Sequence, residues 1–292
     1  PITASGKAEQ GNYKVTYVAG TLTITKAETM TLTPELTGKD AEKEYDSKPL
    51  SGGATASVTK GTTITYSTDG GKTWSEELPS ITNVGTLNVT AKAENKNYKD
   101  VTVEYKLKVT RKAVTVKADN KSKVFGEKDP ELTATVEGTL GKDTVEYTLS
   151  RKAGEDVGTY PITASGKAEQ GNYKVTYVAG TLTITSQSID PGTDPEKPNP
   201  DYTGAKVNSP KDSVYDGKEH KWSPTVTDKS KKLELGTDYT VEYSTKNFKD
   251  VGTIDVTITG IGNYSGTVKR SYKVTPKEYT VTTESATKTY SG

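Results

Sequence analysis

The chain has 292 residues, 30% of them hydrophobic, and its 39 basic and 38 acidic residues leave a net charge of +1. Such a chain lacks the concentrated positive charge that nucleic acids and anionic membranes require, and no apolar run approaches the roughly 20 residues of a membrane span. It contains no cysteine, which excludes disulfides, thiolate chemistry and cysteine-type zinc sites. No signal peptide is visible and the first residue is not Met, so we expect a segment of a longer protein.

The sequence repeats itself. Its opening residues, PITASGKAEQGNYKVTYVAGTLTIT, return unchanged at residues 161–185, which predicts a repeat architecture. Apolar residues alternate with polar ones, a period that predicts half-buried strands. The clearest cases are residues 101–109, 145–149, 254–258 and 268–274. No amphipathic helix of three turns is present and the best short candidate is residues 128–134, so we predict an all-β chain.

Three short motifs recur in a fixed order. An aromatic turn follows the opening strand, a Val-Gly-Thr precedes a later strand, and an Asn-Tyr follows that strand. We interpret them as scaffold, with glycine at a bend or bulge and tyrosine anchored at a domain edge. The defining residues are Tyr45, Phe125 and Tyr215 in the aromatic turn, Gly85, Gly158 and Gly252 in Val-Gly-Thr, and Tyr13, Tyr98, Tyr173 and Tyr264 in Asn-Tyr.

The motifs divide the chain into units of a size usual for small β domains. In chain order these are residues 1–25 (the last strands of a truncated repeat), 26–110 and 111–185 (complete repeats), 186–200 (an extended proline-rich linker), 201–275 (a third repeat) and 276–292 (the start of a further one). We expect the first segment not to fold alone. It either completes a domain with another chain, for instance through residues 276–292, or packs against residues 26–110.

The second repeat resembles a known family. VFGEKDPELT at residues 124–133, LSRKAGEDVGTY at 149–160 and GNY at 171–173 resemble the MBG-type repeat of bacterial adhesins, although Phe125 and Glu127 depart from its usual Tyr-Gly-Asp. The third repeat is similar to the related Tyr-Asp-Gly repeat of Gram-positive surface proteins. The stretches that carry this similarity are YDGK (215–218), LGTDY (235–239), VGT (251–253) and GIGNYSG (260–266), whereas residues 26–110 match more loosely.

This resemblance implies an extracellular, non-catalytic protein of the bacterial surface, anchored to the cell wall through a region outside the chain. For the fold we predict tandem immunoglobulin-like β-sandwiches in an elongated array. A β-grasp-like unit is the alternative, and a helix at residues 128–134 would favour it. The repeats then serve as a stalk or spacer. Alternatively, they bind host glycans or mucin, or other copies of the same protein, through weak multivalent contacts.

Few residues suggest chemistry. STDGGKTW at residues 67–74 fits the Asp box of sialidase propellers, but it occurs once and no arginine cluster accompanies it, so we favour a tight hairpin whose edge Trp74 covers. Exposed aromatics are the expected sugar platforms, which makes Trp74 and Trp222 the glycan-binding candidates, beside their interpretation as edge-covering side chains. His220 is the only histidine, and we interpret it as a surface residue because one histidine cannot form a multi-histidine metal site.

No cofactor is expected, with calcium as an open alternative. Its candidate ligands are Asp119, Asp129 and Glu131, although nearby lysines, Lys123 among them, dilute the negative charge. An isopeptide cross-link between lysine and Asn or Asp is a further alternative, since stalk domains of Gram-positive bacteria can contain one. No pair falls clearly on opposed core-facing positions, and the mass of the intact protein decides the matter.

Overall fold

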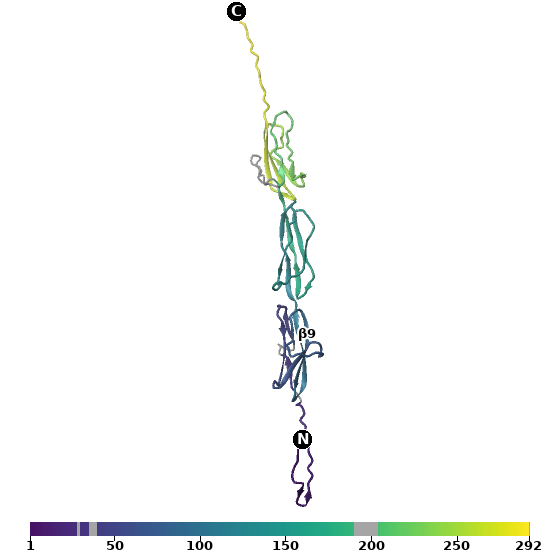
Figure 1. Ribbon diagram of the computed structural model, residues 1–292. Helices are drawn as coiled ribbons and strands as arrows, with labels where there is room; N and C mark the ends of the chain where they lie inside the picture. The colour runs from purple at the N-terminus through teal and green to yellow at the C-terminus, as the bar shows by residue number, and fades with distance from the viewer. Residues whose placement is uncertain (28–29, 35–39, 190–203, 292) are drawn as a thin grey trace. The chain divides into compact units, whose positions relative to one another are not determined.

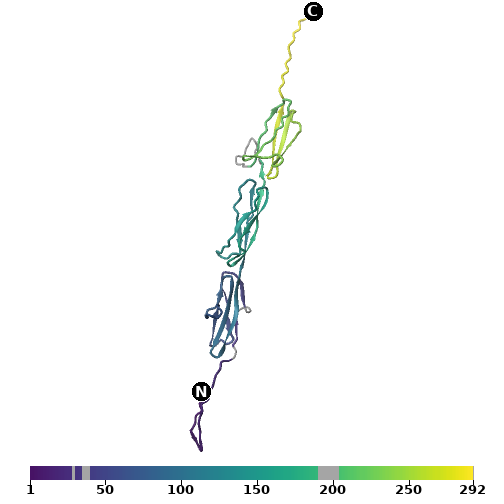
Figure 2. The same cartoon turned by 90° about the vertical axis from the view of Figure 1, so that its right-hand side faces the viewer.

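The computed structural model describes residues 1–27, 30–34, 40–189 and 204–291 (Figure 1). Among these residues there are strands and loops but no helix, and a second view shows the same (Figure 2). Residues 128–134 are not helical, so the feature that would favour a β-grasp unit is absent there. The predicted all-β class of immunoglobulin-like sandwiches is confirmed.

Contacts divide the chain into two compact units. The first comprises residues 1–115, 136–146 and 166–176, and the second comprises residues 116–135, 147–165 and 177–292. Each unit therefore contains one terminal repeat and a share of the second repeat.

The first repeat is built on one long hairpin. Its main sheet has the order β4 (Ala41–Glu44), β10 (Tyr98–Thr110), β9 (Gly85–Asn95) and β7 (Thr62–Ser67). Two short pairs complete the sandwich, namely β3 (Leu32–Pro34) with β6 (Ala54–Ala56) and β5 (Leu50–Ser51) with β8 (Ser80–Ile81). The alternating pattern of β9 and β10 places Val89, Ala91, Ala93, Tyr105 and Leu107 in the core, as period two requires.

The second repeat contains two four-stranded sheets. One has the order β13 (Ala134–Glu137), β11 (Lys112–Ala118), β17 (Tyr173–Val178) and β16 (Glu169–Gln170). The other has the order β12 (Lys121–Val124), β18 (Gly180–Thr185), β15 (Gly158–Ser165) and β14 (Thr148–Arg151). The strands β13 and β14 are therefore both edge strands.

The third repeat again combines one long sheet with short ones. The long sheet has the order β21 (Ser213–Val214), β27 (Thr267–Thr275), β25 (Gly252–Gly260) and β24 (Tyr239–Tyr243). The short ones are β20 (Lys206–Val207), β22 (Val226–Asp228) and β23 (Lys231–Lys232), and the parallel pair β19 (Gln187–Ser188) with β26 (Tyr264–Ser265). Gln187 and Ser188 thus belong to a sheet although we assigned them to the linker, and Ile189 is fully buried. Residues 190–200 of that linker lie outside the described residues.

Each of the three complete repeats closes with the same parallel pairing. A short strand runs beside the end of the last long strand, and the aromatic residue follows it directly. The N–H of that aromatic residue donates to the last threonine carbonyl. This bond joins Tyr45 to Thr110, Phe125 to Thr185 and Tyr215 to Thr275, at 2.8–2.9 Å. The aromatic turn is thereby tied to the end of its own repeat.

Residues 1–25 form a hairpin of β1 (Glu9–Gln10) and β2 (Tyr13–Lys14), closed by a bridge between Ile2 and Gly20. None of these residues, all of which the structure describes, is buried. Ile2 is 56% exposed, whereas Ile162, at the same place in the identical stretch, is fully buried. The same sequence therefore has a core only where the rest of its repeat surrounds it.

Candidate functional site

The Asn-Tyr motif of the second repeat contacts the first repeat. The Asn172 side chain accepts a hydrogen bond from the Val84 N–H through Oδ1 at 2.8 Å and donates one to Asn83 Oδ1 through Nδ2 at 3.1 Å. The ring of Tyr173 meets the ring of Tyr45 edge-on, with centroids 5.7 Å apart. One side-chain amide thus bonds both to a backbone N–H and to a side-chain oxygen, beside a pair of packed aromatic rings.

The third repeat contacts the second in the same way. Asn263 accepts from the Val157 N–H at 2.7 Å and donates to Asp156 Oδ1 at 2.8 Å. The rings of Phe125 and Tyr264 are also edge-on, with centroids 5.5 Å apart. The three sequence motifs therefore meet at each junction, because the aromatic turn and the Val-Gly-Thr of one repeat receive the Asn-Tyr of the next.

A carboxylate holds the tyrosine of each junction. The Tyr173 hydroxyl donates to Asp143 Oδ2 at 2.5 Å, and the Tyr264 hydroxyl donates to Asp228 Oδ2 at 3.2 Å. Burial raises the pKa of both tyrosines, so both remain neutral donors at physiological pH. We interpreted these motifs as scaffold within a domain. The fixed order of the motifs along the chain was consistent with contacts between repeats, but only the three-dimensional structure shows that the motifs form those contacts.

A buried lysine organises an ion-pair cluster in the second repeat. Lys123 has a side chain only 3% exposed, and its Nζ donates to Asp129 Oδ1 at 2.7 Å and to Glu155 Oε2 at 2.5 Å. Arg151 bonds to Asp129 Oδ2 at 2.6 Å and pairs with Glu155 as well. Hydrogen bonds from Arg151 and then Lys123 lower the pKa of Asp129, and those from Lys123 and then Arg151 lower the pKa of Glu155. Ionised carboxylates are poor electrophiles, so this arrangement favours ion pairs over an isopeptide bond.

Two of the three calcium candidates have other partners. Asp129 belongs to the ion-pair cluster, and Asp119 accepts hydrogen bonds from the hydroxyls of Thr133 at 2.5 Å and Thr135 at 2.9 Å. Glu131 is exposed. In the part of the chain that the structure describes, no three His, Cys, Asp or Glu residues gather where they could hold a metal ion. Calcium binding stays a prediction without a geometric site.

The Asp-box residues form a tight turn. Asp69 Oδ1 accepts from the N–H groups of Lys72 and Thr73, both at 3.0 Å, and Oδ2 accepts from the Thr73 hydroxyl at 2.7 Å. These hydrogen bonds hold the pKa of Asp69 far below its usual value, and the bond from the Thr73 N–H has the largest effect. Trp74 covers the turn by donating to Gly71 O at 3.1 Å. The carboxylate is thus engaged by the hairpin itself.

The two tryptophans differ in their availability. Trp74 is 37% exposed, although Lys92 Nζ lies 5.5 Å from its ring centroid. Trp222 is half-buried on the core of the third repeat, with its ring edge-on to Tyr272 at 6.5 Å. His220 Nε2 lies 2.9 Å from Asp216 Oδ1, within the aromatic turn of that repeat. Of the two glycan candidates, Trp74 presents the more accessible ring.

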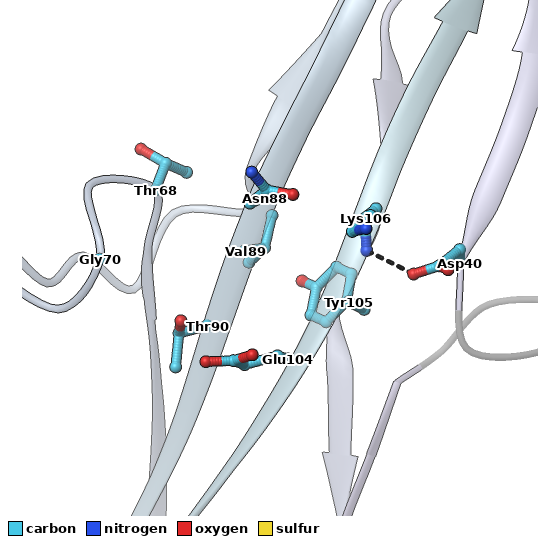
Figure 3. Close-up of a pocket in the computed structure, with 9 residues that line it drawn as sticks. All are labelled: Asp40, Thr68, Gly70, Asn88, Val89, Thr90, Glu104, Tyr105 and Lys106. Atoms are coloured by element: carbon cyan, nitrogen blue, oxygen red, sulfur yellow. Dashed lines mark hydrogen bonds between the residues drawn. The ribbon is translucent and has the colours of Figure 1, made fainter.

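A polar groove of about 480 Å³ lies beside the Asp-box hairpin (Figure 3). Its lining comes from the hairpin, from β9 and β10, and from the loop before β4: Asp40, Thr68, Gly70, Asn88, Val89, Thr90, Glu104, Tyr105 and Lys106. Asp40 accepts from the Lys106 N–H at 2.8 Å, the bond drawn in the figure. The sequence did not indicate this groove. Its lining depends on the register between β9 and β10, which places Thr90 opposite Glu104 and Asn88 opposite Lys106.

Comparison with known proteins supports one resemblance. The family model described as the MBG domain (YGX type) matches residues 114–183, which confirms the MBG resemblance for that part of the second repeat. No protein with a curated description matches the chain.

Solved structures with similar chains share little sequence with it. Three Ig domains of titin, in a Glu-to-Ala variant, are 12% identical, with 86% of this chain and 98% of that chain covered and a TM-score of 0.29. Drosophila N-cadherin EC1–4 is 13% identical, with coverages of 85% and 76% and a TM-score of 0.24. A Bacteroides ovatus protein, SGBP-B in complex with a mixed-linkage heptasaccharide, is 15% identical, with coverages of 85% and 70% and a TM-score of 0.22. Within the described residues, no helix is long and apolar enough to cross a membrane.

Proposed function

We propose that this chain is a non-catalytic repeat region of a bacterial surface adhesin and acts as a stalk or spacer. The observation that carries the proposal is the junction, because two successive pairs of repeats use the same asparagine bonds and the same ring contact. The MBG match at residues 114–183 supports an extracellular surface protein, since MBG domains occur in adhesins. Anchoring to the cell wall through a region outside this chain belongs to the same proposal.

The physical basis is the cost of bending at the junction. A plain linker leaves neighbouring domains free to reorient, whereas a spacer must hold them at a fixed angle. At each junction, bending would break two hydrogen bonds of one asparagine and separate two aromatic rings. Stability then follows from each repeat and its nearest neighbours, as in other repeat arrays.

Small-angle scattering tests the spacer role directly. We expect a long, rigid profile for the intact chain and a broader distribution of sizes for the Asn172→Ala/Asn263→Ala double variant. An Asn208→Ala variant is the control, because Asn208 bonds to Thr225 within the third repeat. A globular profile of the intact chain would contradict the proposal.

Glycan or mucin binding is the second candidate, and the groove in Figure 3 is the observation that favours it. Its polar lining provides hydrogen-bond partners for sugar hydroxyls, and Trp74 lies on the hairpin that contributes Thr68 and Gly70. Glycan arrays and mucin binding with the intact chain, Trp74→Ala and Glu104→Gln test it. Binding that either substitution removes would support this function, whereas no binding by the intact chain would contradict it.

A further inference from the structure

The parallel pair of each complete repeat joins a strand near the beginning of the repeat to its last strand. In the second repeat, residues 121–124 of β12 lie opposite residues 182–185 of β18. The first repeat has the same arrangement in β4 and β10, and the third has it in β21 and β27. Each pair thus connects the part of the repeat where the chain enters with the strand by which the chain leaves.

One end of each pair is closed by the last threonine. Its carbonyl accepts the hydrogen bond from the N–H of the aromatic residue, as described above. Its hydroxyl also donates to the carbonyl two residues before that aromatic residue. These hydroxyl bonds join Thr110 to Lys43 at 3.3 Å, Thr185 to Lys123 at 3.3 Å and Thr275 to Ser213 at 3.2 Å.

The other end of each pair is closed by a side chain. The residue directly before the short strand is Asp or Asn, and its Oδ1 accepts from a backbone N–H directly before the paired part of the last strand. These bonds join Asp40 to Lys106 at 2.8 Å, Asn120 to Thr181 at 2.9 Å and Asp212 to Lys273 at 2.7 Å. The same end bonds therefore recur in all three repeats, although the surrounding sequences differ.

The direction of the two strands determines how tension along the chain acts on them. Tension draws the short strand toward its N-terminal end and the last strand toward its C-terminal end. Because the strands are parallel, these two directions are opposite along one axis, so the strands must slide past each other. All the hydrogen bonds between them are then strained together. An antiparallel pair pulled from one end would instead open one bond after another.

Another strand precedes the short strand in each repeat and comes under tension first. These strands are β3, β11 and β20, and they pair with β6, with β13 and β17, and with β22, respectively. When such a strand detaches, the tension passes to the short strand that follows it. The parallel pair is then the direct connection between the two ends of the repeat.

We propose that the parallel pair and its end bonds form a mechanical clamp in each of the three repeats, by which the repeat resists unfolding under tension. The clamps are β4 with β10, β12 with β18, and β21 with β27. This property goes beyond the spacer role, because it concerns the strength of each repeat and not the angle between repeats.

The three clamps differ in length, which predicts an order of unfolding. The first and the second contain four residue pairs each, whereas the third contains two. Side chains add to the longer clamps. Glu42 and Lys108 form an ion pair across the first at 3.1 Å, and Lys123 of the second is held by Asp129 and Glu155. Because fewer bonds share the tension in the third clamp, the third repeat unfolds at the lowest force.

Single-molecule force spectroscopy of the intact chain, pulled from its two ends, tests the proposal. We expect three unfolding events, one for each repeat. Asp212→Ala removes the bond to the Lys273 N–H from the third clamp. It should speed the weakest event at constant force by about fivefold, the factor that one hydrogen bond represents, because forced unfolding follows the unfolding rate.

Ser244→Ala is the matched control in the same repeat. Ser244 Oγ accepts from the Asp255 N–H at 2.9 Å, and both Ser244 and Asp212 are exposed. The bond of Ser244 lies beside β24, at the opposite edge of the sheet from β21. Each substitution removes one bond from a backbone N–H to a side chain, so chemical denaturation should show similar losses of equilibrium stability. Only Asp212→Ala should speed unfolding under force.

Asn120→Ala tests the predicted order, because it removes the corresponding bond from the second clamp. It should speed one of the two stronger events and leave the weakest event unchanged. The proposal is overturned if Ser244→Ala speeds the weakest event as much as Asp212→Ala does, or if Asp212→Ala changes no event. It is also overturned if the weakest event responds to Asn120→Ala.

Discussion

Lys123 shows how a residue's role depends on its neighbours in space. From the sequence we treated it as one of several lysines that dilute an acidic loop. The structure buries its side chain and surrounds it with Asp129 and Glu155, with Arg151 bridging the same two carboxylates. The alternation of β12 points this side chain inward. Asp129 follows Lys123 by six residues, but Glu155 follows it by 32 residues, and the strand pattern does not place Glu155 beside Lys123.

The cluster predicts an acid-sensitive second repeat. Because the pKa values of Asp129 and Glu155 are lowered in the folded state, their contribution is present above the unfolded values near pH 4 and is lost as the pH falls through the lower, folded values. We expect protection of this repeat from hydrogen exchange to fall between about pH 5 and pH 3, and Lys123→Met to reduce that fall. Lys128→Met, at an exposed lysine of the same loop, is the control. Equal acid sensitivity in the two variants would refute the role of the cluster.

At the scale of elements, period-two patterns located the long strands well. Residues 101–109, 254–258 and 268–274 lie within β10, β25 and β27. The exception is residues 145–149, where β14 begins only at Thr148. Before it, the Gln170 side chain takes the place of a neighbouring strand, accepting from the Glu146 N–H at 2.7 Å and donating to Glu146 O at 2.8 Å. A local pattern reports which face is buried, but it does not report which group satisfies the backbone.

The duplicated stretch allows one substitution to be compared in two environments. A Cβ at Gly180 would lie 2.5 Å from Ala118 O and 2.8 Å from Asp119 O, whereas at Gly20 its closest neighbour would be Ile2 Cβ at 3.7 Å. We expect Gly180→Ala to destabilise the second repeat by about 1–3 kcal/mol through overpacking. Gly20→Ala should leave the free energy of unfolding unchanged. Chemical denaturation at low protein concentration measures both effects, and equal effects would contradict the difference in packing.

At the scale of the whole molecule, the contacts between repeats are the feature that the sequence did not reveal. The order of the motifs and the size of the repeats were visible, and the MBG resemblance holds at residues 114–183. The junction required the knowledge that Asn172 and Asn263 reach backward to the preceding repeat. Such contacts join segments that are 88 and 106 residues apart in the chain, so no local pattern contains them.

The proposed spacer role requires each junction to hold its two repeats in one arrangement, and pulsed electron spin resonance tests this requirement most directly. The chain contains no cysteine, so Lys96→Cys and Lys142→Cys provide a unique pair of labels at exposed positions on either side of the first junction. We predict one narrow distance distribution, which broadens when Asn172→Ala and Tyr45→Ala are added. A broad distribution in the otherwise unsubstituted chain, or a narrow one that survives both substitutions, would contradict the account.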